Sequence, residues 1–163
     1  MSKIVDIFEY AMQMEKDGEN FYRDLAVKSS SQGVTRILTM LADDEVKHYN
    51  IIKAIAEEAG PEMTETTILA DAKNVFAHME ETAFSFEEMQ IDLYHQAQEI
   101  EQRSQAFYEE KAEQVADPAA QKILLKIADE EQRHYFLLDN IIEFMNRPIN
   151  WIEDAEFNHL DEY

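Results

Sequence analysis

The strongest constraint on the fold of this chain is an internal repeat. An offset of 86 residues, the separation of Glu15 and Glu101, aligns two parts of the sequence without a gap. The matched pairs are Ala11 with Ala97, Glu15 with Glu101, Phe21 and Tyr22 with Phe107 and Tyr108, Leu38 with Leu124, Ala42 with Ala128, Asp43 with Asp129, Glu45 with Glu131, His48 with His134 and Tyr49 with Tyr135. The sequence therefore predicts two similar structural units packed against each other.

Each unit is predicted to be a helical hairpin. Only three glycines and three prolines interrupt a 163-residue chain rich in helix-favouring residues, so we predict an all-α protein. Periodicity and capping signals place helices over 3–28, 34–59, 86–115 and 118–146. Ser85 with Glu88 resembles a capping box, and Asp117 with Pro118 resembles an N-cap followed by proline at the first helical position. Short connections within each pair favour antiparallel hairpins.

The remaining segments complete the predicted domain organisation. Residues 61–85 are long enough to cross the length of a bundle, and TILADAKNVFAHM within them is a candidate short helix. We therefore expect a four-helix bundle with one long crossover over residues 1–146. The acidic and aromatic tail over 147–163 carries too many large apolar groups for a disordered segment. We expect it to pack on the bundle or across a homodimer interface, in preference to docking a partner.

Glutamate and histidine occupy core positions of these helices. Steps of three and four residues define one buried face on each helix. In chain order these faces contain Ile4, Phe8, Ala11, Glu15, Gly18, Tyr22 and Leu25; Val34, Leu38, Leu41, Glu45, His48, Ile52 and Ile55; Tyr94, Ala97, Glu101, Ser104 and Tyr108; and Leu124, Ile127, Glu131, His134, Leu138, Ile141 and Met145. Four carboxylates and two imidazoles are therefore predicted to meet in the interior.

Such a cluster requires neutralisation. Four buried carboxylates would repel one another and either take up protons or unfold the bundle. Two divalent ions carry four positive charges, and each Glu-x-x-His motif puts two ligands one turn apart on the same helix face. One such motif is weak evidence. Two of them, each preceded by a glutamate 30 residues earlier (Glu15 before Glu45, Glu101 before Glu131), match the ligand pattern of di-metal sites in helix bundles.

Four further residues are candidates for supporting roles. Tyr22 and Tyr108 each lie seven residues after a predicted ligand, so they are either core aromatics or hydroxyl donors to a ligand carboxylate. Asp44 and Glu130 directly precede the Glu-x-x-His glutamates. They either orient a histidine of the opposite hairpin or are exposed helix charges.

With these motifs, residues 3–146 resemble the rubrerythrin branch of the ferritin-like di-iron carboxylate proteins. The resemblance implies that Glu45 and Glu131 bridge two metals, that Glu15 and His48 hold one, and that Glu101 and His134 hold the other. It also implies a cofactor of two iron ions, although manganese or a mixed iron and zinc pair suits the same ligands.

The resemblance is incomplete at two places. Rubrerythrins proper carry a C-terminal rubredoxin domain, which is absent from this chain. They also have an extra glutamate one turn beyond the third-helix ligand, where this sequence has Arg103 and Ser104. The second difference puts the redox-dependent iron movement of the family in doubt.

The activity implied by the resemblance is reduction of hydrogen peroxide, or of dioxygen, with electrons from a separate donor protein such as a rubredoxin. Two alternatives stay open: an iron-binding ferroxidase without peroxide turnover, and a bundle that uses metal for structure or binds another protein. Light scattering would separate a homodimer from a large ferritin-type shell.

Charge and composition exclude several other classes. The formal net charge of −21 repels nucleic acid and anionic lipid, so neither is an expected partner. No cysteine is present, which excludes disulfides, thiolate nucleophiles and an internal rubredoxin-type iron centre. The N-terminal residues MSKIVDIFEY contain no long apolar run, so we expect no signal peptide and no membrane span, and a cytoplasmic location.

Overall fold

The computed structural model describes residues 3–57 and 88–146. Within these ranges the chain forms four α-helices and no strand: α1 (Lys3–Lys28), α2 (Gln32–Ala56), α4 (Glu88–Gln114) and α5 (Pro118–Asn146). The predicted all-α class and four-helix arrangement are therefore confirmed. The predicted crossover over 61–85, its candidate short helix and the tail over 147–163 lie outside the described residues.

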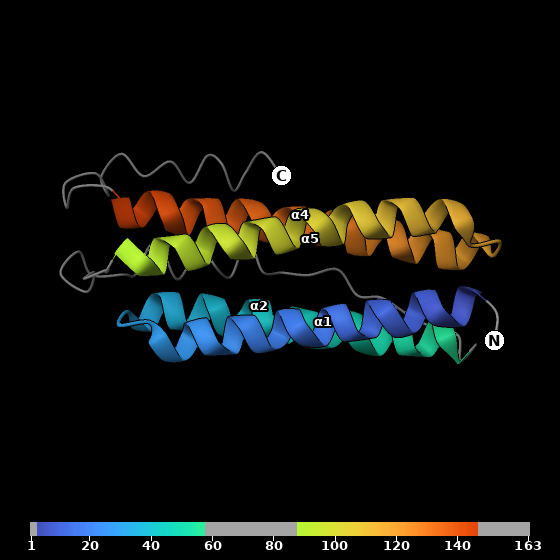
Figure 1. Cartoon of the computed structure of the whole chain (residues 1–163), viewed down its shortest axis with the longest axis horizontal. Coiled ribbons are helices and arrows are strands. Elements are labelled where there is room, and N and C mark those ends of the chain that lie inside the picture. Colours follow the sequence, from blue (N-terminus) through green and yellow to red (C-terminus); the bar gives the residue numbers. More distant parts are fainter. Residues whose placement is uncertain (1–2, 58–87, 147–163) are drawn as a thin grey trace.

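The four helices form two antiparallel hairpins. α1 packs along α2 and α4 packs along α5, whereas contacts between the hairpins are far fewer. Figure 1 shows the two hairpins side by side, with α1 next to α4. This arrangement follows from the repeat, because each half of the sequence encodes one hairpin and the two halves pack face to face.

Local capping chemistry fixes the helix ends. α2 begins at Gln32, two residues before the predicted Val34, because Ser31 is the N-cap and its hydroxyl accepts a hydrogen bond of 3.3 Å from the Val34 N–H. α2 ends at Ala56 instead of the predicted Ala59. Pro118 begins α5, as the sequence predicts. The Asp117 carboxylate accepts a hydrogen bond of 3.1 Å from the Ala119 N–H.

The other predicted ends are close to those observed. α4 ends at Gln114, one residue before the predicted end, and α5 ends at the predicted Asn146. α4 begins at Glu88, but its predicted capping partner Ser85 lies outside the described residues.

The core consists of two apolar clusters with a polar layer between them. One cluster includes Leu25, Leu38 and Leu138, and the other includes Phe8, Ile52 and Leu124. On every helix the two clusters occupy opposite ends of the buried face, so the residues between them lie at the middle of the bundle. That middle layer contains the predicted glutamates and histidines.

Candidate metal centre

All six predicted ligands lie in the middle layer and are removed from solvent. Their exposed fractions are at most 3%. α1 contributes Glu15, α2 contributes Glu45 and His48, α4 contributes Glu101, and α5 contributes Glu131 and His134. The spacing of three and four residues places these side chains on the buried face of each helix. Packing of the two hairpins then brings them together.

The six residues form two overlapping groups. Ligand atoms of Glu15, Glu45, His48 and Glu131 all lie within 4.8 Å of one another, and so do those of Glu45, Glu101, Glu131 and His134. Glu45 and Glu131 belong to both groups. Each group is able to hold a metal ion, and the two shared glutamates suit a pair of adjacent ions.

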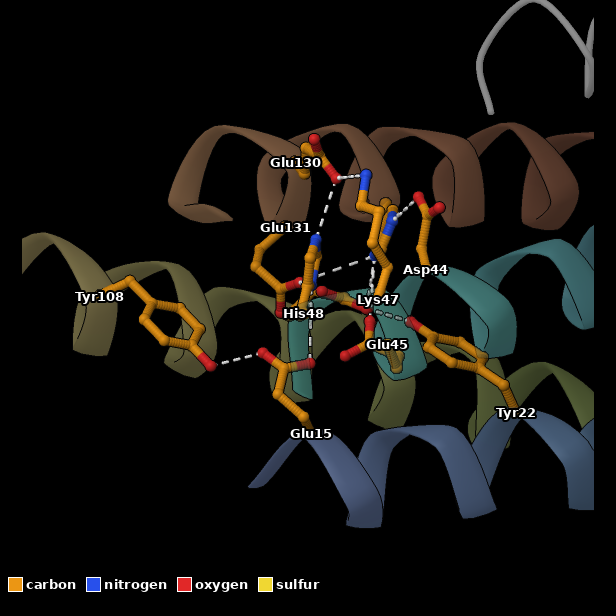
Figure 2. Close-up of polar contacts among 11 residues, drawn as sticks. Glu15, Tyr22, Asp44, Glu45, Lys47, His48, Tyr108, Glu130 and Glu131 are labelled. Atoms are coloured by element: carbon orange, nitrogen blue, oxygen red, sulfur yellow. Dashed lines mark hydrogen bonds and ion pairs between the residues drawn. The ribbon is translucent and has the colours of Figure 1, made fainter. Parts of the chain in front are cut away.

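Each histidine is oriented by a carboxylate of the opposite hairpin, as Figure 2 shows for His48 and Glu130. His48 Nε2 lies 2.9 Å from Glu130 Oε1, and His134 Nε2 lies 2.9 Å from Asp44 Oδ2. The two rings are stacked, with centroids 5.9 Å apart. Because Nε2 of each ring faces a carboxylate, Nδ1 is the nitrogen directed into the centre of the site. Asp44 and Glu130 were predicted either to orient a histidine or to be exposed helix charges, and the structure shows the contact with histidine.

The Nδ1 atoms face the inner carboxylates. His48 Nδ1 lies 2.9 Å from Glu131 Oε1 and 3.5 Å from Glu15 Oε2. His134 Nδ1 lies 3.1 Å from Glu45 Oε1 and 3.3 Å from Glu101 Oε1. Burial by itself lowers the pKa of both histidines, but the nearby carboxylates outweigh it and hold each pKa well above the usual value. Without metal, the doubly protonated form of both imidazoles is therefore favoured, and a metal ion bound at Nδ1 would displace one of the two ring protons.

Two of the buried tyrosines, Tyr22 and Tyr108, also make contacts between the hairpins. Tyr108 of α4 donates a 2.5 Å hydrogen bond to Glu15 Oε1 of α1, and Tyr22 of α1 donates to Glu101 Oε1 of α4. Burial, followed by the charge of these glutamates, raises the pKa of both tyrosines well above the usual value, so they remain hydroxyl donors. Each tyrosine therefore holds a predicted ligand of the other hairpin.

The carboxylates do not all behave alike. Burial and then the charges of neighbouring glutamates raise the pKa of Glu45 and of Glu131 well above the usual value. Burial alone would also raise the pKa of Glu15, but its contact with Glu45, together with His48 and Tyr108, holds that pKa below the usual value. Protonation of the two shared glutamates is therefore favoured in the protein without metal, because it limits repulsion among the carboxylates.

Several inward-facing atoms have no hydrogen-bond partner. They are Oε2 of Glu15, Nδ1 of His48, Oε2 of Glu101 and Oε1 of Glu131. His48 Nδ1 and Glu131 Oε1 are close together but lack hydrogen-bond geometry. Buried polar atoms are rarely left unsatisfied, and these oxygen and nitrogen atoms are the donor types that iron, manganese and zinc accept. The residues present therefore fit a pair of metal ions.

Two neighbours of the site were not predicted from the sequence. Lys47 Nζ lies 2.9 Å from Glu130 Oε1, so the carboxylate that orients His48 is itself paired with a cation. Gly18 lies so close to Glu45 that a Cβ atom at this position would be 3.2 Å from Glu45 Oε2. The signal for Lys47 is its place beside His48 in the motif, and the signal for Gly18 is its place one turn after Glu15.

A family model described as Rubrerythrin matches residues 6–142. The chain belongs to the rubrerythrin family. Among solved structures, it is similar to a hypothetical protein, Pfu-1136390-001, from Pyrococcus furiosus, with 20% sequence identity and a TM-score of 0.66, over 91% of this chain and 92% of that one. This second similarity concerns the fold alone. No curated protein matches the chain.

The turn of α4 that follows Glu101, where rubrerythrins proper have an extra glutamate, contains Arg103 and Ser104 in this chain. Ser104 lies one turn after Glu101 with an exposed fraction of 3%, and Arg103 beside it has an exposed side chain. No carboxylate therefore enters the site from this turn of α4. Among the described helices of this rubrerythrin-family chain, none has a segment both long and apolar enough to span a bilayer.

Proposed function

We propose that this chain is a non-haem di-iron oxidoreductase that reduces hydrogen peroxide, or dioxygen, with electrons from a separate donor protein. The observation that supports this proposal most directly is the pair of overlapping ligand groups that share Glu45 and Glu131. A structural metal site needs one closed ligand set, whereas two sets with common carboxylates bring two ions together for joint two-electron chemistry.

The proposed ligand assignment follows the two groups. Glu15 and His48 would hold one ion, Glu101 and His134 would hold the other, and Glu45 and Glu131 would be available to both. When bound, a pair of ferrous ions supplies two electrons together to an oxygen–oxygen bond, and two protons complete the reduction of peroxide to water. Manganese or a mixed iron and zinc pair fits the same oxygen and nitrogen donors, so the choice of iron is part of the proposal.

The residues of this chain tune the site in three ways. The Nε2 contacts to Glu130 and Asp44 fix the orientation of the histidine rings and keep Nδ1 as the ligand atom. The Tyr22 and Tyr108 hydroxyls fix one oxygen each of Glu101 and Glu15, leaving the other for metal. The apolar clusters on both sides exclude water and strengthen these electrostatic contacts.

The proposal is tested by loading the full chain with iron(II) under anaerobic conditions. Metal analysis should find two irons per chain, and stopped-flow absorbance should show oxidation by one equivalent of hydrogen peroxide much faster than that of free iron(II). A Glu45→Ala variant should lose the effect, while Asp43→Ala, on the exposed side of α2, should keep it. If hydrogen peroxide oxidises the bound iron(II) no faster than it oxidises free iron(II), the proposal is overturned.

The assembly and the donor are also parts of the proposal. We propose that the chain forms a homodimer in the cytoplasm. We also propose a rubredoxin-type protein as the electron donor, because the 163 residues contain no cysteine that could ligate a rubredoxin centre. Light scattering should give the mass of two chains. A large shell would instead favour a ferritin-type role in iron handling.

A further inference from the structure

A pocket opens between α1 and α4 at the level of the metal centre. Its volume is about 300 Å³, near the lower end of the range of roughly 300–1,000 Å³ that is common for small-molecule sites. Gly18 and Ser104 line it and are buried, whereas Gln13, Asp17 and Arg103 line it and are exposed. The two small residues therefore form the floor and the three polar residues form the rim.

The floor of the pocket lies against the candidate metal centre. Gly18 and Ser104 are equivalent positions in the repeat, each one turn after an inner glutamate. The Oε2 atom of Glu45 would be only 3.2 Å from a Cβ placed on Gly18. Because neither floor residue has a large side chain, the pocket extends to the Gly18 backbone, which lies next to Glu45.

The chemistry of the walls indicates the class of ligand. Met14, Phe21 and Ile100 contribute apolar walls, which suit a flat hydrocarbon ring. At the rim, Asp17 accepts a 2.8 Å hydrogen bond from Gln13, and a carboxylate has lone pairs for further donors. The rim therefore suits a ligand that has a hydrogen-bond donor on an apolar ring.

Charge distinguishes between possible donors. The net charge of −21 disfavours an anionic ligand, and the described rim carries one cation, Arg103, and one carboxylate, Asp17, whose charges offset each other. A neutral hydroxyl donor suits a rim of this kind, because it carries no charge of either sign.

We infer that this pocket binds a small neutral hydroxy-aromatic molecule of the phenol class, with its ring between α1 and α4 and one edge on the floor beside Glu45. The binding depends only on the pocket.

The inference is tested with 4-fluorophenol as the probe, by titrating the full chain and following the fluorine NMR signal. Saturable binding is expected, and Ile100→Trp, which fills the pocket from its wall, should weaken it by at least about tenfold. The matched control is Leu125→Trp, an exposed position of α5 outside the pocket lining, which should bind as the wild type does. The anionic probe 4-fluorobenzoate should bind more weakly than 4-fluorophenol.

Several outcomes would overturn the inference. These are non-saturable binding, equal binding by Ile100→Trp and Leu125→Trp, or tighter binding of 4-fluorobenzoate. If Ile100→Trp does not fold, Ser104→Leu, which fills the pocket from its floor, takes its place with the same expected loss. The titration needs neither iron nor peroxide, so failure of the peroxide assay with intact binding would reject the proposed function alone.

Discussion

The Tyr108 hydroxyl donates a hydrogen bond of 2.5 Å to Glu15, which lies 93 residues earlier on the other hairpin. Tyr22 makes the equivalent bond to Glu101 in the opposite direction. These buried bonds connect α1 with α4 across the two hairpins, in the polar layer between the apolar clusters. They also fix the two glutamates that are not shared between the metal groups.

Replacing Tyr108 by phenylalanine should destabilise the protein and preserve metal binding. The substitution leaves Glu15 Oε1 buried without its donor, at a cost of roughly 1–3 kcal/mol in the free energy of unfolding. Urea denaturation measures this cost, and metal analysis should still find two ions per chain. Tyr10→Phe on the exposed side of α1 is the matched control and should change neither quantity. A Tyr108→Phe protein as stable as the wild type would show that the bond contributes nothing.

Glu45 and Glu131 should matter more for metal binding than Glu15 and Glu101. Each shared glutamate belongs to both ligand groups, so Glu45→Ala or Glu131→Ala removes a ligand from both ions and should abolish binding of the pair. Glu15→Ala should weaken one ion and leave the other bound. Metal analysis after dialysis distinguishes these results. Equal metal content in all three variants would contradict the ligand assignment.

Removing the carboxylate that orients His48 should weaken metal binding without removing a ligand. Glu130→Gln disturbs the 2.9 Å contacts of Glu130 Oε1 with His48 Nε2 and with Lys47. Loss of such an outer partner costs on the order of 10- to 100-fold in metal affinity. Competition with a chromophoric chelator measures the affinity. Asp129→Asn, one residue earlier and paired with Arg133 on the same helix, is the control and should keep the wild-type value.

Much of the fold and of the candidate metal centre could be predicted, because the residue spacing within each helix determines its buried face and the two halves of the sequence repeat the same spacing. The faces that contain Leu38, Glu45 and His48, or Leu124, Glu131 and His134, are visible in the spacing of three and four residues. Their burial in the structure follows that spacing. The Asp117–Pro118 signal also marks the start of α5 correctly.

Features that depend on how the hairpins approach each other could not be predicted. Tyr22 lies two turns from Glu15 on the same helix, and only the packing of α1 on α4 shows that it bonds to Glu101 instead. The pocket has a similar origin. The small residues Gly18 and Ser104 are visible at matching positions of the repeat, but the space above them depends on the separation of the two helices.

Replacing Glu45 by glutamine should stabilise the protein without metal and flatten its pH dependence. Burial and the charges of Glu131, Glu15 and Glu101 raise the pKa of Glu45 in the folded state above its unfolded value. The stability associated with its proton is therefore present at low pH and is lost as pH rises through the folded pKa. Glutamine cannot ionise, so Glu45→Gln should avoid this loss, by on the order of 1 kcal/mol or more at the alkaline end.

The measurement is urea denaturation at a series of pH values above the usual carboxyl pKa, in the presence of a chelator. Glu9→Gln, on the exposed side of α1, is the control and should follow the wild type at every pH. Added metal should reverse the order, because the wild type then gains binding energy that Glu45→Gln cannot match. A variant that loses stability with rising pH as steeply as the wild type would mean that Glu45 is not one of the groups that hold the protons of the empty site.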